Sequence, residues 1–276
     1  MRTLVHLSDL HFGRVDTRLL APLIDRIVKI QPDLVVVSGD LTQRARSDQF
    51  KAAREFLDVL PRPQIVVPGN HDIPLHNVFD RFVRPLQKYR RHISDDLEPA
   101  YVDGEIAVLG VNTARSATIK GGRINQDQLG RLRARMTSVP GGTIKVVVTH
   151  HPFDLPSHYH DGNLVGRAPA AMQLFAECGV DLLLAGHFHA SHAGDTAVRY
   201  RIGGYVAVAA QAGTATSTRG RGEVNAFNLV HLDPSHITIE RYGWDAESGT
   251  FTASHADVFT RTAGGWSRST PSDHAR

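Results

Sequence analysis

Side chains that bind divalent metal ions recur along this chain in short, closely spaced segments. A carboxylate placed between two ions, with neutral imidazoles and amide oxygens around it, is a donor set that paired divalent ions use. The segments are Asp9-Leu10-His11, Gly39-Asp40, Gly69-Asn70-His71-Asp72, Thr149-His150-His151 and Gly186-His187-Phe188-His189. Their residue types predict a site for two ions, built from oxygen and nitrogen donors.

Asp40 is the natural bridge between two ions, because no second donor stands beside it in its segment. The other candidate ligands would then divide between the ions, with Asp9, His11 and His189 on one, and Asn70, His150 and His187 on the other. Taken singly these motifs are weak, since Asp-x-His is common and Gly-Asp after a strand is usually a turn. Their ordered recurrence favours metal binding over a series of unrelated turns.

Each segment follows a short apolar run bounded by Gly, Pro or Ser, a pattern typical of buried strands. The runs cover residues 3–7, 34–37, 65–67, 146–148 and 182–184. In open α/β sheets, ligands collect just beyond the carboxyl ends of the strands. We therefore expect these strand ends to bring the candidate ligands to one rim.

Amphipathic helical patterns alternate with the apolar runs through the first two thirds of the chain. Apolar residues recur at helical spacing over residues 19–28 and 50–60, and Ser47 is the expected N-cap of the second helix. Asn125 is expected to cap a helix running to residue 136, and Gly179 to close one over residues 168–178. A further helical stretch at 75–92 should break near Pro85. This alternation predicts an α/β fold with a mostly parallel central sheet.

The last third of the sequence has a different character. Residues 205–210, 226–232 and 237–242 are predicted strands separated by turns, and they suggest a second, antiparallel sheet packed on the first. We expect one domain over residues 1–262, with a cap-like helical segment at about 74–98. Residues 263–276, rich in Ser, Arg and Gly, are expected to form a flexible tail.

Composition is that of an ordinary enzyme. With 276 residues, of which 41% are hydrophobic and 21% charged, the chain can bury a large core. The net charge of +3 suits an anionic substrate without demanding nucleic acid. The lone Cys178 excludes an internal disulfide and a thiolate metal cage, and no run resembles a signal peptide or a membrane span. These features favour the cytoplasm.

In order and spacing, the segments resemble the calcineurin-like metallophosphoesterase superfamily, whose pattern runs D-x-H, G-D, G-N-H-[DE], H and G-H-x-H. Every element of that pattern is present between residues 5 and 189. The resemblance, to the bacterial phosphodiesterase-type branch, implies an α/β four-layer α/β/β/α sandwich of two mixed β-sheets flanked by helices. It also implies a centre of two divalent metal ions (Mn, Fe or Zn) and hydrolysis of phosphoric esters.

By this resemblance, a hydroxide that bridges the two ions attacks phosphorus in line with the leaving group. His71, next to the candidate ligand Asn70, would face the leaving-group oxygen as a proton donor or a charge stabiliser. Asp72 is expected to orient His71. A catalytically silent metal-binding scaffold is disfavoured, because the chain keeps the whole donor set and His71.

Three other positions near the segments receive lesser roles. His151 is expected to be a structural neighbour of His150, and His6 a hydrogen-bonded core residue. Residues 216–221 could reach the phosphate or form a solvated turn; Arg219 and Arg221 beside glycines favour a mobile loop, and no role is assigned to them.

Substrate choice is less determined by the sequence. A phosphodiesterase of cyclic nucleotides or small glycerophosphodiesters is favoured, and a lipid-directed phosphoesterase, of the phospholipase C or nucleotide-sugar-lipid pyrophosphatase type, is the alternative. Residues 79–91 interleave aromatic and basic side chains that would suit peripheral contact with the inner membrane surface. The plainer interpretation is a surface helix that buries its aromatic residues. This stretch also leaves open a homodimer contact.

A nuclease is disfavoured, because the sequence has no long basic run and no basic–aromatic platform beyond residues 79–91. No stable nucleic-acid partner is therefore expected. A protein phosphatase, another activity found in the superfamily, ranks below the phosphodiesterase. The expected partner is a phosphate-ester substrate, either a small molecule or a phospholipid.

Overall fold

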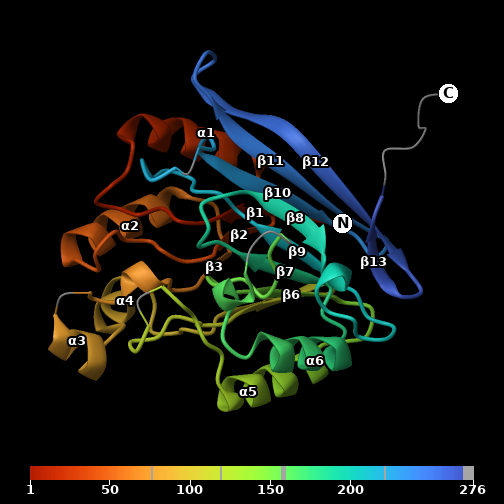
Figure 1. Cartoon of the computed structure of the whole chain (residues 1–276). Coiled ribbons are helices and arrows are strands. Elements are labelled where there is room, and N and C mark those ends of the chain that lie inside the picture. The colour runs from red at the N-terminus through yellow and green to blue at the C-terminus, as the bar shows by residue number, and fades with distance from the viewer. Residues whose placement is uncertain (76, 119, 157–159, 221, 270–276) are drawn as a thin grey trace.

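Two mixed β-sheets lie at the centre of the structure (Figure 1), a computed structural model that describes residues 1–75, 77–118, 120–156, 160–220 and 222–269. The first sheet has the strand order β13-β12-β11-β10-β1-β2-β3. Its strands are β1 (Arg2–Leu7), β2 (Leu34–Val37), β3 (Gln64–Val66), β10 (Ala226–Leu232), β11 (His236–Asp245), β12 (Thr250–Thr262) and β13 (Gly265–Arg268).

The second sheet has the strand order β4-β5-β6-β7-β9-β8. Its strands are β4 (Ala100–Val102), β5 (Ile106–Gly110), β6 (Ile144–Val148), β7 (Leu182–Ala185), β8 (His192–Asp195) and β9 (Val208–Gln211). In the second sheet the central strands β5, β6, β7 and β9 are parallel, and β4 and β8 pair antiparallel at its two edges. In the first sheet the parallel strands β1, β2 and β3 form one end, and β10 to β13 continue the sheet with antiparallel pairing.

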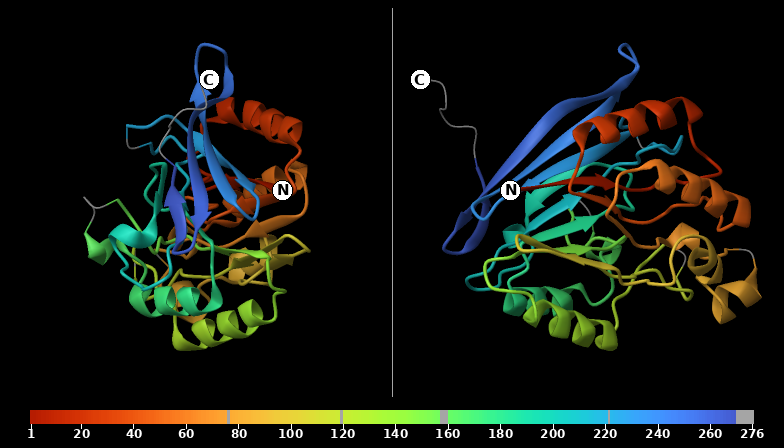
Figure 2. Two further views of the ribbon diagram at one scale, coloured as in Figure 1. Left: turned by 90° about the vertical axis from the view of Figure 1, so that its right-hand side faces the viewer. Right: turned by 180° about the vertical axis from the view of Figure 1, so that it is seen from behind.

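Helices cover the outer face of each sheet. α1 (Leu20–Ile30) and α2 (Ser47–Val59) pack on the first sheet, and α5 (Gln126–Thr137) and α6 (Ala168–Cys178) pack on the second. Two short helices, α3 (Val78–Val83) and α4 (Gln87–His92), lie at one end of the molecule (Figures 1 and 2). They are separated at Pro85, as predicted, and the expected α/β/β/α sandwich is confirmed.

Three apolar layers hold the sandwich together. Side chains along a strand alternate between its two faces, so Val5 of β1 packs towards α1 and α2 while Leu4 packs between the sheets. The third layer, between the second sheet and its helices, includes Met136 and Phe175. Because both faces of the central strands are buried, their sequences are continuous apolar runs.

Helix ends agree closely with the predictions from sequence. The Asn125 side chain accepts a hydrogen bond from the Gln128 backbone as the N-cap of α5, and Gly179 closes α6 with φ 65°. The N-cap predicted for α2 is wrong by one residue. Helix α2 begins at Ser47 itself, and its N-cap is Arg46, whose side chain makes no capping hydrogen bond.

The C-terminal strands do not form the separate antiparallel sheet that we expected. β10 pairs antiparallel with β1, so the C-terminal strands extend the first sheet, whereas β9 pairs parallel with β7 in the second. An apolar pattern identifies a strand but does not specify which strand lies beside it. The five ligand-bearing strands are therefore divided, with β1, β2 and β3 in one sheet and β6 and β7 in the other.

Part of the predicted flexible tail is a strand. β13 pairs with β12, and Trp266 at its centre is only 2% exposed. The indole Nε1 donates a hydrogen bond to Asp181 Oδ1, which also accepts one from Arg261. Burial of this large aromatic side chain stabilises a segment whose average composition resembles a tail. Residues 270–276 lie outside the described part of the chain.

Candidate metal centre

The strands that precede the candidate ligands all end at one rim of the sandwich, although they belong to two sheets. Asp9 and His11 follow β1, Asp40 follows β2, Asn70 begins the short 3₁₀ turn Asn70–Asp72 after β3, His150 follows β6, and His187 and His189 follow β7. The predicted convergence of these side chains is what the structure shows. Their assignment as metal ligands stays a prediction.

Asp9, His11 and His189 form the first group of donors. The Asp9 Oδ1 atom lies 3.5 Å from His11 Nε2 and 3.2 Å from His189 Nε2. The two imidazole nitrogens are themselves 3.2 Å apart. Three donor atoms from two loops, one after β1 and one after β7, thus lie close together, as the ligands of one cation do.

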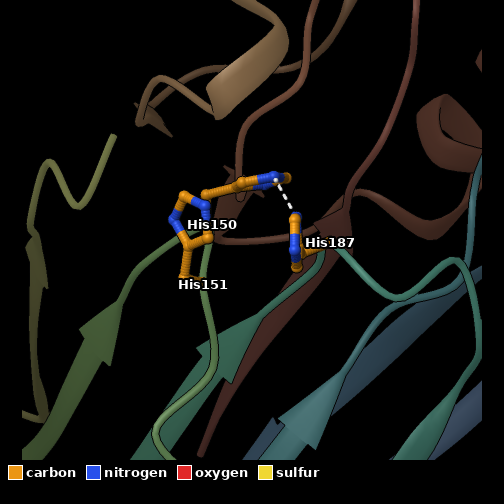
Figure 3. A group of neighbouring side chains, drawn as sticks. All are labelled: His150, His151 and His187. Carbon is orange, nitrogen blue, oxygen red and sulfur yellow. Dashed lines mark hydrogen bonds between the residues drawn. The ribbon is translucent and has the colours of Figure 1, made fainter. Parts of the chain in front are cut away.

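Asp40 lies between the first group and a second one. Its Oδ2 atom is 3.7 Å from His11 Nε2 and 3.3 Å from His150 Nε2. In the second group, His150 Nε2 lies 3.1 Å from Asn70 Oδ1. It also lies 3.2 Å from His187 Nδ1 (Figure 3). This central position is the one that a bridging carboxylate requires.

Contacts behind the imidazoles fix which nitrogen faces the centre. His150 Nδ1 lies 2.8 Å from the Ser38 carbonyl oxygen, and His189 Nδ1 lies 3.2 Å from the Arg219 carbonyl oxygen. A carbonyl oxygen can only accept a hydrogen bond, so each Nδ1 carries the hydrogen. The neutral ring then presents the lone pair of Nε2 to the cluster, which is the tautomer that metal coordination needs. The donor set therefore fits divalent cations.

Charge in the cluster also favours cations. Asp9 and Asp40 are buried, which by itself raises the pKa of a carboxyl group, but neighbouring histidines outweigh burial and lower both pKa values. Burial likewise lowers the pKa of His150, yet the negative charge of Asp40 raises it to about 9. Two buried carboxylates thus stay ionised and require positive charge beside them. Bound cations would supply it in place of a protonated histidine.

Backbone strain is concentrated at the candidate ligands. Among the described residues other than glycine, eight have a positive φ, and five of these are candidate ligands: Asp9 (53°), His11 (51°), Asp40 (52°), His187 (76°) and His189 (56°). This left-handed conformation is uncommon for such residues, and strain of this kind tends to cluster at functional sites. The surrounding structure therefore holds these loops in the shape that directs their side chains to one point.

The glycines beside the ligands serve close packing more than sharp turns. Gly39 has the positive φ (93°) expected of a turn, but Gly69 is extended, with φ −105° and ψ −176°. A Cβ at Gly69 would lie 2.2 Å from Asp40 Oδ1, and one at Gly186 would lie 1.7 Å from Ser8 Oγ. At these two positions the absent side chain makes room for the ligand loops.

His71 lies at the edge of the cluster, with its ring 4.8 Å from the ring of His11. Its Nδ1 lies 2.9 Å from the Gln43 carbonyl oxygen, and its Nε2 lies 3.0 Å from Arg219 Nη1. The carbonyl fixes the hydrogen on Nδ1, so Nε2 accepts a hydrogen bond from the Arg219 guanidinium.

Asp72 does not orient the His71 ring as expected, because its carboxylate is hydrogen-bonded to the backbone of neighbouring loops. Its oxygens accept hydrogen bonds from the backbone N–H groups of Leu41, Thr42 and Gly69. Asp72 thereby joins the loops that carry Asp40 and Asn70. Burial, and then the charge of Asp40, raise its pKa to about 6.

Arg219, to which the sequence assigned no role, lies beside His71. The side chain is half-buried and contacts His71, while its backbone carbonyl oxygen contacts His189. Its loop is tied to the rim, since the backbone N–H of Thr218 donates to the carbonyl of Arg14. The one clue in the sequence is the run of small polar residues before it, Thr214 to Ser217, which the structure buries.

His151 and His6 have the supporting positions that were expected. The His151 ring lies 4.9 Å from that of His150 (Figure 3), and its nitrogens contact Thr113 Oγ1 at 2.9 Å and the Lys120 carbonyl oxygen at 3.1 Å. His6 is buried, with Nε2 2.9 Å from Ser38 Oγ, and burial lowers its pKa to about 3.

The chain belongs to the calcineurin-like phosphoesterase family, whose family model matches residues 2–191. The resemblance seen in the sequence is thus confirmed, and the chain is a metal-dependent phosphoester hydrolase. In fold it is similar to a purple acid phosphatase from yellow lupin (TM-score 0.69, 13% identity, covering 92% of this chain and 53% of that one). It is also similar to a dimetal phosphatase from Danio rerio (TM-score 0.64, 14% identity, covering 91% and 98%). At these identities the likeness shows the fold alone.

Relatives similar in sequence carry phosphodiesterase names. The chain is 26% identical over 197 residues to the glycerophosphodiester phosphodiesterase GpdQ of Enterobacter lignolyticus, covering 64% of this chain and 69% of the relative. It is 28% identical over 198 residues to the 3',5'-cyclic adenosine monophosphate phosphodiesterase CpdA of Pseudomonas aeruginosa, covering 67% and 69%. A probable GpdQ of Arcobacter nitrofigilis is 27% identical, and the match spans 58% of its length.

Proposed function

We propose that this chain is a phosphodiesterase whose centre holds two divalent metal ions (Mn, Fe or Zn). The observation that carries the proposal is the position of Asp40 between two groups of donors. Asp9, His11 and His189 would hold one ion, Asn70, His150 and His187 the other, and Asp40 both. When bound, such ions activate water and neutralise charge on phosphoryl oxygens.

His71 and Arg219 are the groups that would meet the substrate beside the ions. Since Gln43 holds the hydrogen of His71 on Nδ1, the neutral ring has no hydrogen on Nε2 to donate. The positive charge at this position comes from Arg219. Of the two roles expected for His71, we therefore favour charge stabilisation, exerted by holding the Arg219 guanidinium towards the phosphate.

A small phosphodiester is the favoured substrate, and the names of the similar relatives support this class. A lipid-directed phosphoesterase is the second candidate. It is supported by the apolar side chains that helix α3 exposes a few residues after Asp72.

The test is a substrate panel with manganese and a measurement of bound metal. We expect about two ions per chain and turnover of bis-p-nitrophenyl phosphate, both lost on exhaustive chelation. Rates on cyclic AMP, glycerophosphocholine, phosphatidylcholine and a phosphomonoester would rank the substrate classes. Full turnover by metal-free protein would overturn the proposal.

His71→Ala tests the catalytic assignment. We expect the variant to keep its metal content and to lose most of kcat, because Arg219 loses the partner that holds it. Near wild-type turnover of a diester with a poor leaving group, at unchanged metal content, would reject the role.

A further inference from the structure

Helix α3 is built with the ordinary burial pattern reversed. Its apolar side chains are exposed: Val78 (68%), Phe79 (60%), Phe82 (60%) and Val83 (58%). Its buried side chain is a cation, Arg81, which is 7% exposed. A surface helix normally turns its apolar stripe towards the core and its charges to solvent. Exposed apolar patches of this kind usually mark a binding surface.

Specific hydrogen bonds hold the helix in this orientation. Arg81 donates from Nη1 to the Pro74 carbonyl oxygen at 3.2 Å and from Nη2 to the Thr118 carbonyl oxygen at 2.6 Å. These bonds direct the guanidinium inward, and the residues on the other side of the helix face outward.

The basic–aromatic stretch therefore divides into two parts. In α4, Tyr89 is fully buried, and its hydroxyl donates to the Val66 carbonyl oxygen at 2.9 Å. There the expectation of buried aromatic residues is confirmed. In α3 it is wrong, because Phe79 and Phe82 are exposed. Helix α3 itself lies at the periphery of the molecule (Figure 1).

Cationic side chains border the apolar patch. The Arg84 guanidinium lies 5.9 Å from the centre of the Phe79 ring, and Arg90 and Arg91 are exposed on α4. The acidic residue within α3, Asp80, is engaged by Asn77 at the helix start. Arg84 thus lies directly beside the apolar groups of the patch, Arg90 lines the same cavity as Val83, and Arg91 is a further exposed cation on α4.

A cavity of about 510 Å³ opens beside this patch. Val83 and Arg84 line it together with Leu86, Arg90 and Ile73. Because Ile73 directly follows the Asn70–Asp72 turn, the cavity adjoins the loop that carries the candidate metal site.

We propose that α3, with Arg84, Arg90 and Arg91, docks this protein on an anionic membrane surface. Phe79 and Phe82 would enter the apolar boundary of the bilayer, and the arginines would contact lipid phosphates. A symmetric contact with a second copy is disfavoured, because it would bring the same arginines together. Within the described residues no helix has the length and apolar content to cross a bilayer, so the contact would be peripheral. The inference goes beyond the proposed function and does not depend on bound metal.

The test is sedimentation of the whole 276-residue chain with vesicles, at low and high salt. We expect binding to phosphatidylcholine vesicles that contain phosphatidylglycerol, and weaker binding to phosphatidylcholine alone. The double variant Phe79→Ser/Phe82→Ser should bind at least about tenfold more weakly, and Arg84→Glu/Arg91→Glu should lose the preference for anionic vesicles. The matched control is Val28→Ser/Val198→Ser, which removes exposed apolar side chains (48% and 77%) elsewhere on the surface.

Turnover of bis-p-nitrophenyl phosphate, expected to be unchanged, reports that each variant is folded. If a serine variant misfolds, Phe79→Leu/Phe82→Leu and the charge reversal decide instead. The leucine variant should retain binding, and the charge reversal should lose the preference for anionic vesicles. Failure of wild-type protein to bind anionic vesicles, or equal loss in the valine control, would overturn the proposal. The proposal would also be overturned if the wild-type protein were a dimer that binds no vesicles and if the phenylalanine variants were monomers. Vesicle binding is measured both with and without a chelator. A failure of the proposed catalytic function can therefore be distinguished from a failure of membrane docking.

Discussion

The ligand rim and helix α3 depart from the ordinary burial rule in opposite directions. At the rim, Asp9, His11 and His150 are polar side chains with no exposed surface, whereas α3 leaves Phe79 and Phe82 more than half exposed. Each arrangement is unfavourable for the isolated chain, because it leaves charge desolvated or apolar surface in water. A ligand that supplies what is missing removes the cost. The comparison therefore indicates cations at the rim and an apolar, anionic surface at α3.

The two regions also differ in how firmly they are held. Rim residues are fixed by left-handed backbone conformations, by hydrogen bonds behind the imidazoles and by glycines that admit no Cβ. Helix α3 is oriented by the hydrogen bonds of Arg81, and its outer face contacts solvent. Substitutions at the rim should accordingly be severe, and those on the outer face of α3 mild.

The largest effect is expected at Asp40. Asp40→Asn removes the charge shared by the two donor groups, and we expect about a thousandfold loss of kcat with loss of bound metal. Metal analysis and turnover of bis-p-nitrophenyl phosphate measure both. Asp58→Asn, at an exposed ion pair with Arg54 and Arg62, is the matched control and should change neither quantity. Metal retained at two ions per chain by the Asp40 variant would remove this residue from the site.

Arg219 should come next. Arg219→Ala is expected to lower kcat about a hundredfold at unchanged metal content, since the variant lacks the charge that His71 directs towards the phosphate. Arg219→Lys should recover part of the loss. Arg18→Ala, at an exposed ion pair with Asp16, is the control. A change confined to KM, with kcat intact, would show that Arg219 binds substrate without assisting the reaction.

A substitution at Gly69 tests the close packing of the rim without changing the charge of the site. Gly69→Ala places a Cβ against Asp40 Oδ1, and we expect about 1–3 kcal/mol of lost stability together with weaker metal binding. Gly141→Ala is the control, because a Cβ there meets nothing within 4 Å. Urea unfolding of both variants measures the difference. Equal stability of the two would mean that the ligand loops can move apart.

The smallest effect is expected on α3. Phe79→Ser/Phe82→Ser should change the free energy of unfolding by less than about 0.5 kcal/mol, since neither ring belongs to an apolar layer. Urea unfolding without vesicles checks this. A loss as large as that of Gly69→Ala would place the rings in the fold and contradict the comparison.

Much of the candidate site followed from local features of the sequence. The apolar runs before Asp9, Asp40 and His150 are strands, and each ends where the sequence predicts that a donor should appear. Asn125 begins α5 and Gly179 ends α6 as predicted, because capping depends on a few neighbouring residues. Strand ends and helix caps can therefore be predicted from the few residues around them.

The sequence by itself determined which donors exist and that each stands at a strand end. Only the tertiary structure decided that β10 pairs with β1, that Asp72 joins loops instead of orienting His71, and that Arg219 reaches His71 across 148 positions of the chain. It also decided that Arg81 faces inward and Phe79 outward. The physical reason is that periodicity and capping act over a few residues, whereas these contacts depend on how the sheets and loops pack together.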